Sequence, residues 1–518
     1  MKTFTLKMIV LLVACFMVTT FSMHATNITI GTKGASVGAV DVGNQTWTTG
    51  STVTVYDHMV IPVGKSLTIQ EGVNVQIADT TLKIELIVLG NLYCKGTAAN
   101  PINITVQPNL VPATVSTTKP FPGLWGSIIC DTTCTELLML HTNIKYYGAA
   151  TTQNSPSVQF QLYKDAAGQT EPYLNFRNHN NGKLVVEYCT FSNGMDDGIY
   201  IEGGNVIYAY NTLYQNGLSG GDATNLKAGT VADLGYNMYY SPNTNAFKLS
   251  NSGSRSPQCN VVVYNNTIVN AGWRRPTVKG GSVWYEAGVV AKTYNTLFVN
   301  DRFGIKCDGT QDPACTADYN FYYGYGQNCV NNFNAPTKGL FANGAHDVYG
   351  TTAGSNDPML VNYTLSTDTM NSKLDPTWDF HLKSGSPAIG AGTTTITRHF
   401  GTAGSGLTLG GVEYLSPAPS TTIGAFAAES SAGLVSTKES QFEIYPNPVV
   451  DNLKIKLNSN SNATLVQVYS LLGSKVIEKV INEGSETISL PVASLSNGVY
   501  YVSVKNGSTY SVQKFIKK

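Results

Sequence analysis

The stretch that decides the fold is Glu187-Tyr188-Cys189-Thr190-Phe191-Ser192-Asn193-Gly194, because it returns along the chain in recognisable form. It recurs at 209–217 as AYNTLYQNG, at 263–272 as VYNNTIVNAG and at 293–300 as TYNTLFVN. The tyrosines of the first two copies lie 22 positions apart, and those of the last two lie 30 apart. A period between about 20 and 50 residues predicts a solenoid of stacked coils.

Asparagine and apolar residues have separate roles in this repeat. At each coil a polar residue must turn the chain, and Asn suits this position because it tolerates left-handed backbone angles. Stacked Asn side chains are also expected to hydrogen-bond to one another from coil to coil. The apolar residues of the motif should stack inside, as those of buried parallel strands do; they are Phe191, Leu213, Ile268 and Leu297.

The remaining pattern and the composition agree with an all-β protein. From about residue 46, apolar strands of a few residues alternate with turns, which suits coils because each short strand can pair with the one below it. Loop-like insertions are expected at 107–122, at 149–180 and in parts of 218–256 and 301–356. Charged residues make up 13% and the formal net charge is zero, which excludes nucleic-acid binders that depend on a strongly basic face.

The N-terminus has the composition of a secretory signal peptide. Lys2 and Lys7 form a short positive region ahead of an apolar run at 8–18, which is too short to span a bilayer. Ala25 is the expected cleavage position. A lipoprotein signal is the alternative, because residues 12–15 resemble a lipobox, although the residues that follow stay apolar. The sequence predicts a signal peptide at 1–25 and no transmembrane segment after its removal.

Eight cysteines remain after residue 25, an even number that permits disulfides in an exported chain. The candidates for disulfides are close in sequence: Cys130 with Cys134, and Cys307 with Cys315. The alternative role is that of small buried side chains, which we expect of Cys94, Cys189 and Cys259. No spacing of Cys and His matches a zinc site.

Further stretches resemble a known architecture. Residues 193–199 (NGMDDGI) are similar to the rungs of right-handed parallel β-helix proteins. Residues 379–390 (DFHLKSGSPAIG) and 423–426 (IGAF) resemble the closing segment of exported bacterial β-helix families. The resemblance covers about residues 46–427 and implies a right-handed parallel β-helix domain at 26–427. It implies no particular activity, because this architecture carries many.

The C-terminal part has a different character. Residues 428–441 have the composition of a linker, and 442–518 show the strict apolar alternation and regular turns of a small Ig-like β-sandwich. This tail resembles the type A C-terminal sorting domain of the Bacteroidetes type IX secretion system. The resemblance implies passage through that machinery to the outer cell surface or the medium. Its sorting-signal residues are Tyr445, Pro446, Asn447, Pro448, Gly498, Tyr500, Lys514, Lys517 and Lys518.

Several polar residues are candidates for chemistry. Asp196 and Asp197 form a carboxylate pair that is suited to acid–base work on a glycosidic bond or to calcium binding, but Asp-Asp-Gly is also a common turn. Lys227, near Asp222, and Arg274 are candidate bases for a lyase, with surface cations as the alternative. The Gly-His-Gly and Arg-Ile-Lys motifs of the polygalacturonases are missing, which argues against that mechanism.

Ligand and metal contacts are also suggested by composition alone. Trp273, Trp284 and Tyr285 form a candidate sugar-stacking platform, with burial in the core as the alternative. Asp308 and Asp312 lie in an acidic loop that could hold calcium, the one cofactor considered, or could simply be a turn closed by a disulfide.

Three functions remain open at this point. The favoured hypothesis is a non-catalytic secreted or surface β-helix that binds an extracellular glycan or other ligand. The alternative is a polysaccharide lyase or glycoside hydrolase that acts on an acidic polysaccharide. The third is a structural or adhesive component of the cell surface.

Overall fold

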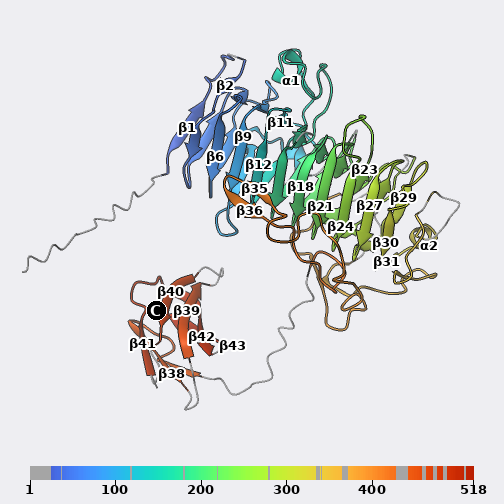
Figure 1. Ribbon diagram of the computed structural model, residues 1–518. Coiled ribbons are helices and arrows are strands. Elements are labelled where there is room, and N and C mark those ends of the chain that lie inside the picture. The colour runs from blue at the N-terminus through green and yellow to red at the C-terminus, as the bar shows by residue number, and fades with distance from the viewer. Residues whose placement is uncertain are drawn as a thin grey trace, which may run out of the picture. The chain divides into compact units, whose positions relative to one another are not determined.

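The computed structural model describes residues 25–36, 38–116, 120–178, 181–218, 220–277, 280–333, 339, 341–364, 372–426, 442–457, 463–470, 475–481, 487–506 and 509–518. The chain forms two compact units, residues 1–427 and 428–518 (Figure 1). The predicted signal peptide and the predicted linker fall outside the described residues, apart from Ala25 at the end of the signal.

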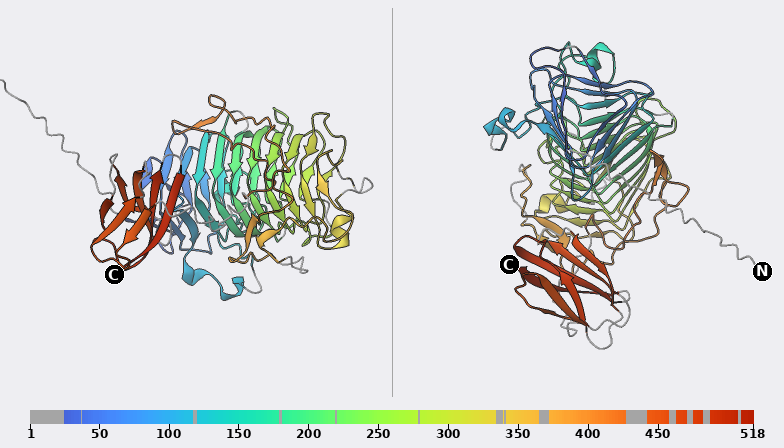
Figure 2. Two further views of the ribbon diagram at one scale, coloured as in Figure 1. Left: turned by 90° about the horizontal axis from the view of Figure 1, so that it is seen from below. Right: turned by 90° about the vertical axis from the view of Figure 1, so that its left-hand side faces the viewer.

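The first unit is a parallel β-helix, as the repeat predicts. Each coil contributes one strand to each of three parallel sheets, and the strands of successive coils stack side by side (Figure 2). Sheet 1 has twelve strands: β1 (Asn27–Ile30), β4 (Thr52–Val55), β7 (Asn74–Ile77), β10 (Ile102–Val106), β13 (Thr142–Lys145), β16 (Thr190–Gly194), β19 (Thr212–Asn216), β22 (Met238–Tyr240), β25 (Thr267–Val269), β28 (Leu297–Val299), β31 (Phe321–Tyr323) and β32 (Val348–Tyr349).

The other two sheets have ten strands each. Sheet 2 contains β2 (Val40–Asp41), β5 (Met59–Ile61), β8 (Leu86–Val88), β11 (Ile128–Cys130), β14 (Leu174–Phe176), β17 (Ile199–Ile201), β20 (Thr224–Leu226), β23 (Phe247–Leu249), β26 (Val283–Tyr285) and β29 (Ile305–Cys307). Sheet 3 contains β3 (Gln45–Trp47), β6 (Ser66–Gln70), β9 (Asn91–Lys95), β12 (Glu136–Leu140), β15 (Lys183–Glu187), β18 (Gly204–Ala209), β21 (Thr230–Gly235), β24 (Asn260–Tyr264), β27 (Val290–Tyr294) and β30 (Thr316–Asp318).

The register of the strands follows the sequence repeat, with one correction. Phe191 pairs with Leu213, which is 22 positions later, and Tyr264 pairs with Tyr294, which is 30 positions later. Ile268, however, pairs with Phe298, so Phe298 and not Leu297 continues the inner column. A shift of one residue moves a side chain to the opposite face of a strand, and Leu297 therefore lies on the outer face, where other residues bury it.

Asparagine forms the expected ladder, but it does not make every turn. Asn211 donates its side-chain N–H to Asn237 Oδ1 (3.1 Å), and Asn237 donates to Asn266 Oδ1 (3.1 Å). The prediction that Asn supplies the left-handed residue is confirmed at the turns with Asn193, Asn265, Asn270, Asn295 and Asn300. It is wrong at the turn before the sheet 1 strand in three earlier coils, where a tyrosine is left-handed. These tyrosines are Tyr188, Tyr210 and Tyr236, and stacking of their rings on one another supports the unusual backbone.

The coils end at β32, and the described residues of 350–426 form an outer strap and not further coils. The strap contains two antiparallel pairs, β33 (Leu360–Asn362) with β34 (Asp379–Leu382) and β35 (Leu407–Leu409) with β36 (Val412–Tyr414). Its apolar side chains cover the outer faces of sheets 1 and 3. The residues of the predicted closing segment, 379–390 and 423–426, therefore lie against the outer faces of the coils and cover them.

Short helices occur only in the insertions of the described chain. They are η1 (Pro108–Leu110), η2 (Ala113–Ser116), α1 (Pro156–Gln159) and α2 (Gln327–Val330). Among the described residues, no helix combines the length and the hydrophobicity needed to cross a membrane.

The eight cysteines after residue 25 are free thiols, which corrects the expected disulfides Cys130–Cys134 and Cys307–Cys315. Six of them are buried, including Cys130 and Cys134, and burial raises the pKa of the Cys94 thiol to about 12. Cys134 donates instead to the backbone carbonyl of Glu136, 3.7 Å away. The cysteines therefore serve mainly as small core side chains.

The second unit contains two antiparallel sheets around one core, as a small Ig-like sandwich requires. The three-stranded sheet contains β37 (Phe442–Tyr445), β38 (Asn452–Leu457) and β41 (Thr487–Pro491). The four-stranded sheet contains β39 (Ala463–Ser470), β40 (Lys475–Val480), β42 (Gly498–Asn506) and β43 (Thr509–Lys517).

Candidate functional site

Polar and aromatic side chains form a strip along the outer face of sheet 2, whose strands β11, β23 and β29 are labelled in Figure 1. Each strand from β14 to β29 in this sheet has three residues. Because side chains alternate between the two faces of a strand, the first and third residues face the core and the central residue points outward. Paired central residues of six successive coils make up this polar strip: Asn175, Tyr200, Asn225, Lys248, Trp284 and Lys306.

Two carboxylates border the strip at the turns that precede β17 and β20. Asp197 Oδ1 accepts the backbone N–H groups of Gly221 and Asp222, both at 2.9 Å, and its Oδ2 accepts from Asn225 at 2.9 Å. Asp222 Oδ1 accepts from Asn245 at 2.6 Å. These bonds hold both carboxylates in place from one coil to the next.

Two lysines lie beside these carboxylates. Lys248 Nζ is 3.4 Å from Glu286 and 4.0 Å from Asp222, and it lies over the ring of Trp284, 5.3 Å from its centroid. Lys227 Nζ lies 5.2 Å from the ring centroid of Tyr200 and is 6% exposed. Within a few coils, the strip therefore combines ammonium groups that lie over aromatic rings with carboxylates that contact a lysine.

The surroundings change the acidity of these groups. Burial, helped by the nearby charge of Asp197, raises the pKa of Asp222 to about 7, although Lys248 opposes the shift. Burial and the charge of Lys248 lower the pKa of Lys227. A raised carboxyl pKa beside a lowered amine pKa is an arrangement that is common at sites of acid–base chemistry.

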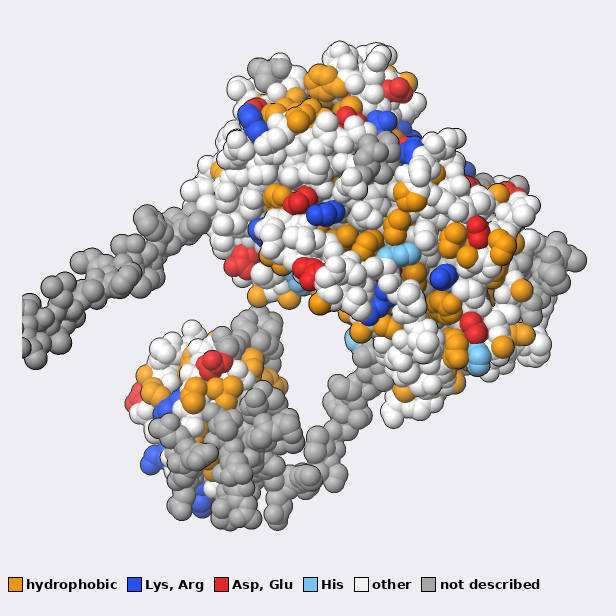
Figure 3. All heavy atoms as spheres, in the orientation of Figure 1, with side chains coloured by type: hydrophobic (Ala, Val, Ile, Leu, Met, Phe, Trp, Pro, Cys, Tyr) orange, Lys and Arg blue, Asp and Glu red, His pale blue; other side chains and the backbone are white. Residues whose placement is uncertain are grey.

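A second charged row runs parallel to the strip. Glu202 is 3.5 Å from both Arg177 and Arg255, and Arg177 is 3.8 Å from Asp131. An open pocket of about 460 Å³ adjoins the other end of the strip and is lined by Glu286, Asp308 and neighbouring residues. On the face seen in Figure 3, most of the described surface is uncharged and charged side chains are few.

The structure brings some predicted residues together and separates others. Asp197 and Lys227 lie at the same strip, whereas Asp196 turns to Thr170 (2.6 Å) and Lys164 (3.7 Å). Arg274 donates to the backbone carbonyls of 216, 217 and 241 and holds those loops together. The structure therefore places Asp197 and Lys227 at the polar strip and gives Arg274 contacts that hold neighbouring loops.

The predicted aromatic and metal residues also separate. Trp284 belongs to the strip, but Tyr285 points into the core and is fully buried, so its assignment as a ligand contact is wrong. Trp273 donates to the carbonyl of residue 300 at 2.7 Å. Asp312 caps the turn at Ala314, and the described residues contain no group of three His, Cys, Asp or Glu placed to hold a metal ion.

Sequence reasoning missed Tyr200, Asn225, Lys248 and Glu286. The signal for Tyr200, Asn225 and Lys248 was the central position in successive short strands, which becomes visible only when the coils are aligned. Glu286 directly follows β26.

The opening residues of the second unit dock on its last strand. Asn447 donates to the carbonyl of Lys514 (3.1 Å) and accepts the backbone N–H of Ile516 (2.9 Å). Gly498 begins β42, and the ring of Tyr500 stacks on Phe515 with centroids 5.6 Å apart. Both ends of the predicted sorting signal therefore meet on one side of the sandwich.

The second unit matches a known protein family. Residues 443–518 match the secretion system C-terminal sorting domain family. The sorting domain indicates export to the extracellular space or the cell surface and contact with the secretion machinery. Neither a curated protein nor a solved structure matches the chain as a relative.

Proposed function

We propose that this exported protein binds an extracellular glycan along the polar strip of sheet 2. One observation supports this function best. Two aromatic rings and two lysines lie together with carboxylates next to an open pocket; they are Tyr200, Trp284, Lys227 and Lys248. Sugars have apolar faces that pack on aromatic rings and hydroxyl groups that bond to fixed polar groups. Coils that repeat about every 4.8 Å supply such groups at regular intervals along an extended chain.

A glycan array probed with the full chain tests this proposal. Wild-type protein is expected to bind at least one polysaccharide class, and Trp284→Ala is expected to weaken that binding at least about tenfold because an aromatic contact is lost. Tyr325→Ala is the matched control, because Tyr325 is an aromatic residue that is 50% exposed in a loop outside the strip. Equal binding by wild type and Trp284→Ala would refute a role for the strip.

A polysaccharide lyase is the second candidate, and the lowered pKa of Lys227 favours it. In a β-elimination, the neutral amine would take the proton from C5 of a uronate, a C4–C5 double bond would form, and the C4–O bond would break, with the leaving oxygen taking a proton. Ultraviolet absorbance of the new double bond on uronate polysaccharides measures this reaction. Turnover that Lys227→Met abolishes while binding persists would establish the enzyme, and absence of turnover would leave the binding function.

A further inference from the structure

A second pocket lies on a different face of the solenoid, against the N-terminal half of sheet 1. Its volume is about 450 Å³, which falls within the range of about 300–1,000 Å³ that is usual for small-molecule sites. Strands β7, β10 and β13 form its floor, and the insertion that begins at Pro108 forms a wall.

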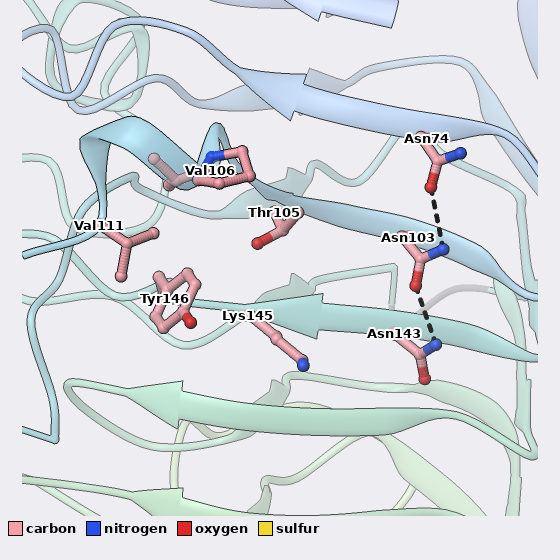
Figure 4. A pocket seen from close by; sticks show the side chains of 9 residues that line it. Asn74, Asn103, Thr105, Val106, Val111, Asn143, Lys145 and Tyr146 are labelled. Atoms are coloured by element: carbon pink, nitrogen blue, oxygen red, sulfur yellow. Dashed lines mark hydrogen bonds between the residues drawn. The ribbon is translucent and has the colours of Figure 1, made fainter. Parts of the chain in front are cut away.

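One side of this pocket is a ladder of amides. Asn103 donates to Asn74 Oδ1 and Asn143 donates to Asn103 Oδ1, both at 3.0 Å (Figure 4). Each bond uses one N–H of the donor amide, so Asn103 and Asn143 each keep a second N–H. Asn143 Oδ1 accepts no hydrogen bond from the described residues. The ladder therefore fixes its amides and still offers donors and an acceptor to a ligand.

The other side and the middle of the pocket complete an amphipathic surface. Val111 and the ring of Tyr146 lie opposite the ladder, with Thr105 and Lys145 between them (Figure 4). Within the described chain, the Thr105 hydroxyl and the Lys145 ammonium make no hydrogen bond or ion pair. An apolar wall facing several unpaired polar groups is the arrangement expected of a sugar site.

The charge of the pocket selects among sugars. Lys145 is the only charged residue among the nine that line it, and no carboxylate neutralises it there. An ammonium flanked by amide N–H donors favours an anionic group. The polar strip, in contrast, pairs its lysines with carboxylates.

We propose that this amide pocket binds an anionic sugar residue, uronate or sulfated, at a position separate from the polar strip. The ligand's anion contacts Lys145 and the free N–H groups of Asn103 and Asn143. Its apolar face packs on Tyr146 and Val111.

Titration calorimetry on the full chain tests the amide pocket with three probes: trigalacturonate, its carboxyl-reduced neutral counterpart and a sulfated galactose trisaccharide. Wild type is expected to bind one or both anionic probes and to bind the neutral probe at least about tenfold more weakly. Lys145→Met should remove that preference and Lys145→Arg should keep most of it. Lys33→Met is the matched control, because this exposed lysine follows β1, four strands or about 19 Å away in the same sheet.

Other outcomes overturn the proposal. Equal losses in Lys145→Met and Lys33→Met would indicate diffuse attraction by surface charge. Anion binding that survives Lys145→Met but disappears in Trp284→Ala would place the ligand on the polar strip, which would leave the function proposed above intact. Thr105→Val keeps the shape of the side chain and should also weaken binding, so the conclusion does not depend on one variant. An unchanged circular dichroism spectrum shows that each variant is folded.

Discussion

Replacement of Asp233 by alanine is expected to release the outer strap from the coils. Asp233 lies on β21, between Ile207 and Val262 in the outward column of sheet 3, and is fully buried by the strap. Its carboxylate accepts the backbone N–H groups of His399 (3.0 Å) and Phe400 (2.8 Å) and the hydroxyl of Ser416 (2.6 Å).

The magnitude follows from these three bonds. A hydrogen bond to a charged group contributes about 1.5–3 kcal/mol, and a buried donor left without an acceptor costs about 1–3 kcal/mol. Because the energies do not add fully and the strap keeps its apolar contacts, the strap should lose about 3–5 kcal/mol of local stability. That change corresponds to roughly a 10²- to 4 × 10³-fold increase in the fraction of time the strap is open.

Hydrogen exchange measures this opening directly. Amides of 393–422 should exchange faster in Asp233→Ala by the factor above, whereas amides of sheet 2 should keep their wild-type protection. Asp165→Ala is the control, because Asp165 is exposed and distant from the strap in sequence. If strap amides in Asp233→Ala exchange within about threefold of wild type, the carboxylate does not hold the strap and the reasoning is wrong.

Three further predictions concern the solenoid. Because the pKa of Asp222 is raised to about 7, the folded state loses stability relative to the unfolded state as pH rises from about 4 to about 7. Asp222→Asn removes that loss. The free energy of unfolding in urea should therefore favour the variant over wild type more at pH 8 than at pH 4.5, by at most about 4 kcal/mol. Asn237→Ala should lower the free energy of unfolding by about 3 kcal/mol, since this fully buried side chain bonds to both neighbouring coils, and an unchanged denaturation midpoint would contradict the ladder. Thiol reagents should label native protein only at the half-buried Cys307 and Cys315, and rapid labelling of more than two thiols would count against the buried positions of the rest.

The sequence predicted the coils because their signal is local and repeats. Phe191 and Leu213 pair as the 22-residue period requires. The error at Leu297 arose because residues 294–297 repeat the letters of 210–213, although in this coil the inner residue, Phe298, lies four positions after the tyrosine and not three. In a strand of period 2, that single residue changes the face. The strap was not predicted as a separate element because its partners, such as Asp233 and Ser416, lie 183 positions apart.

The site was predicted as residue types but not as an arrangement. Asp197 and Lys227 were candidates on chemical grounds, and their convergence depends on the lengths of the intervening turns, which vary from coil to coil. Arg274 has the same chemistry, yet its position in a loop directs it to backbone carbonyls. The charge and the hydrogen-bonding capacity of a side chain can be read from a sequence. The direction in which the side chain points depends on the register of its strand and on its loop.

The strap also sets an order of events during folding. Coils can form one after another, since each needs only its neighbours, but the residues that cover Leu297, Val299 and Phe321 lie at 360–423. A chain that emerges from its N-terminus would thus complete its winding while this apolar column still faces water. The solenoid would remain prone to aggregation during that interval. Docking of the strap, which is synthesised last in this unit, would bury the apolar column and end that risk.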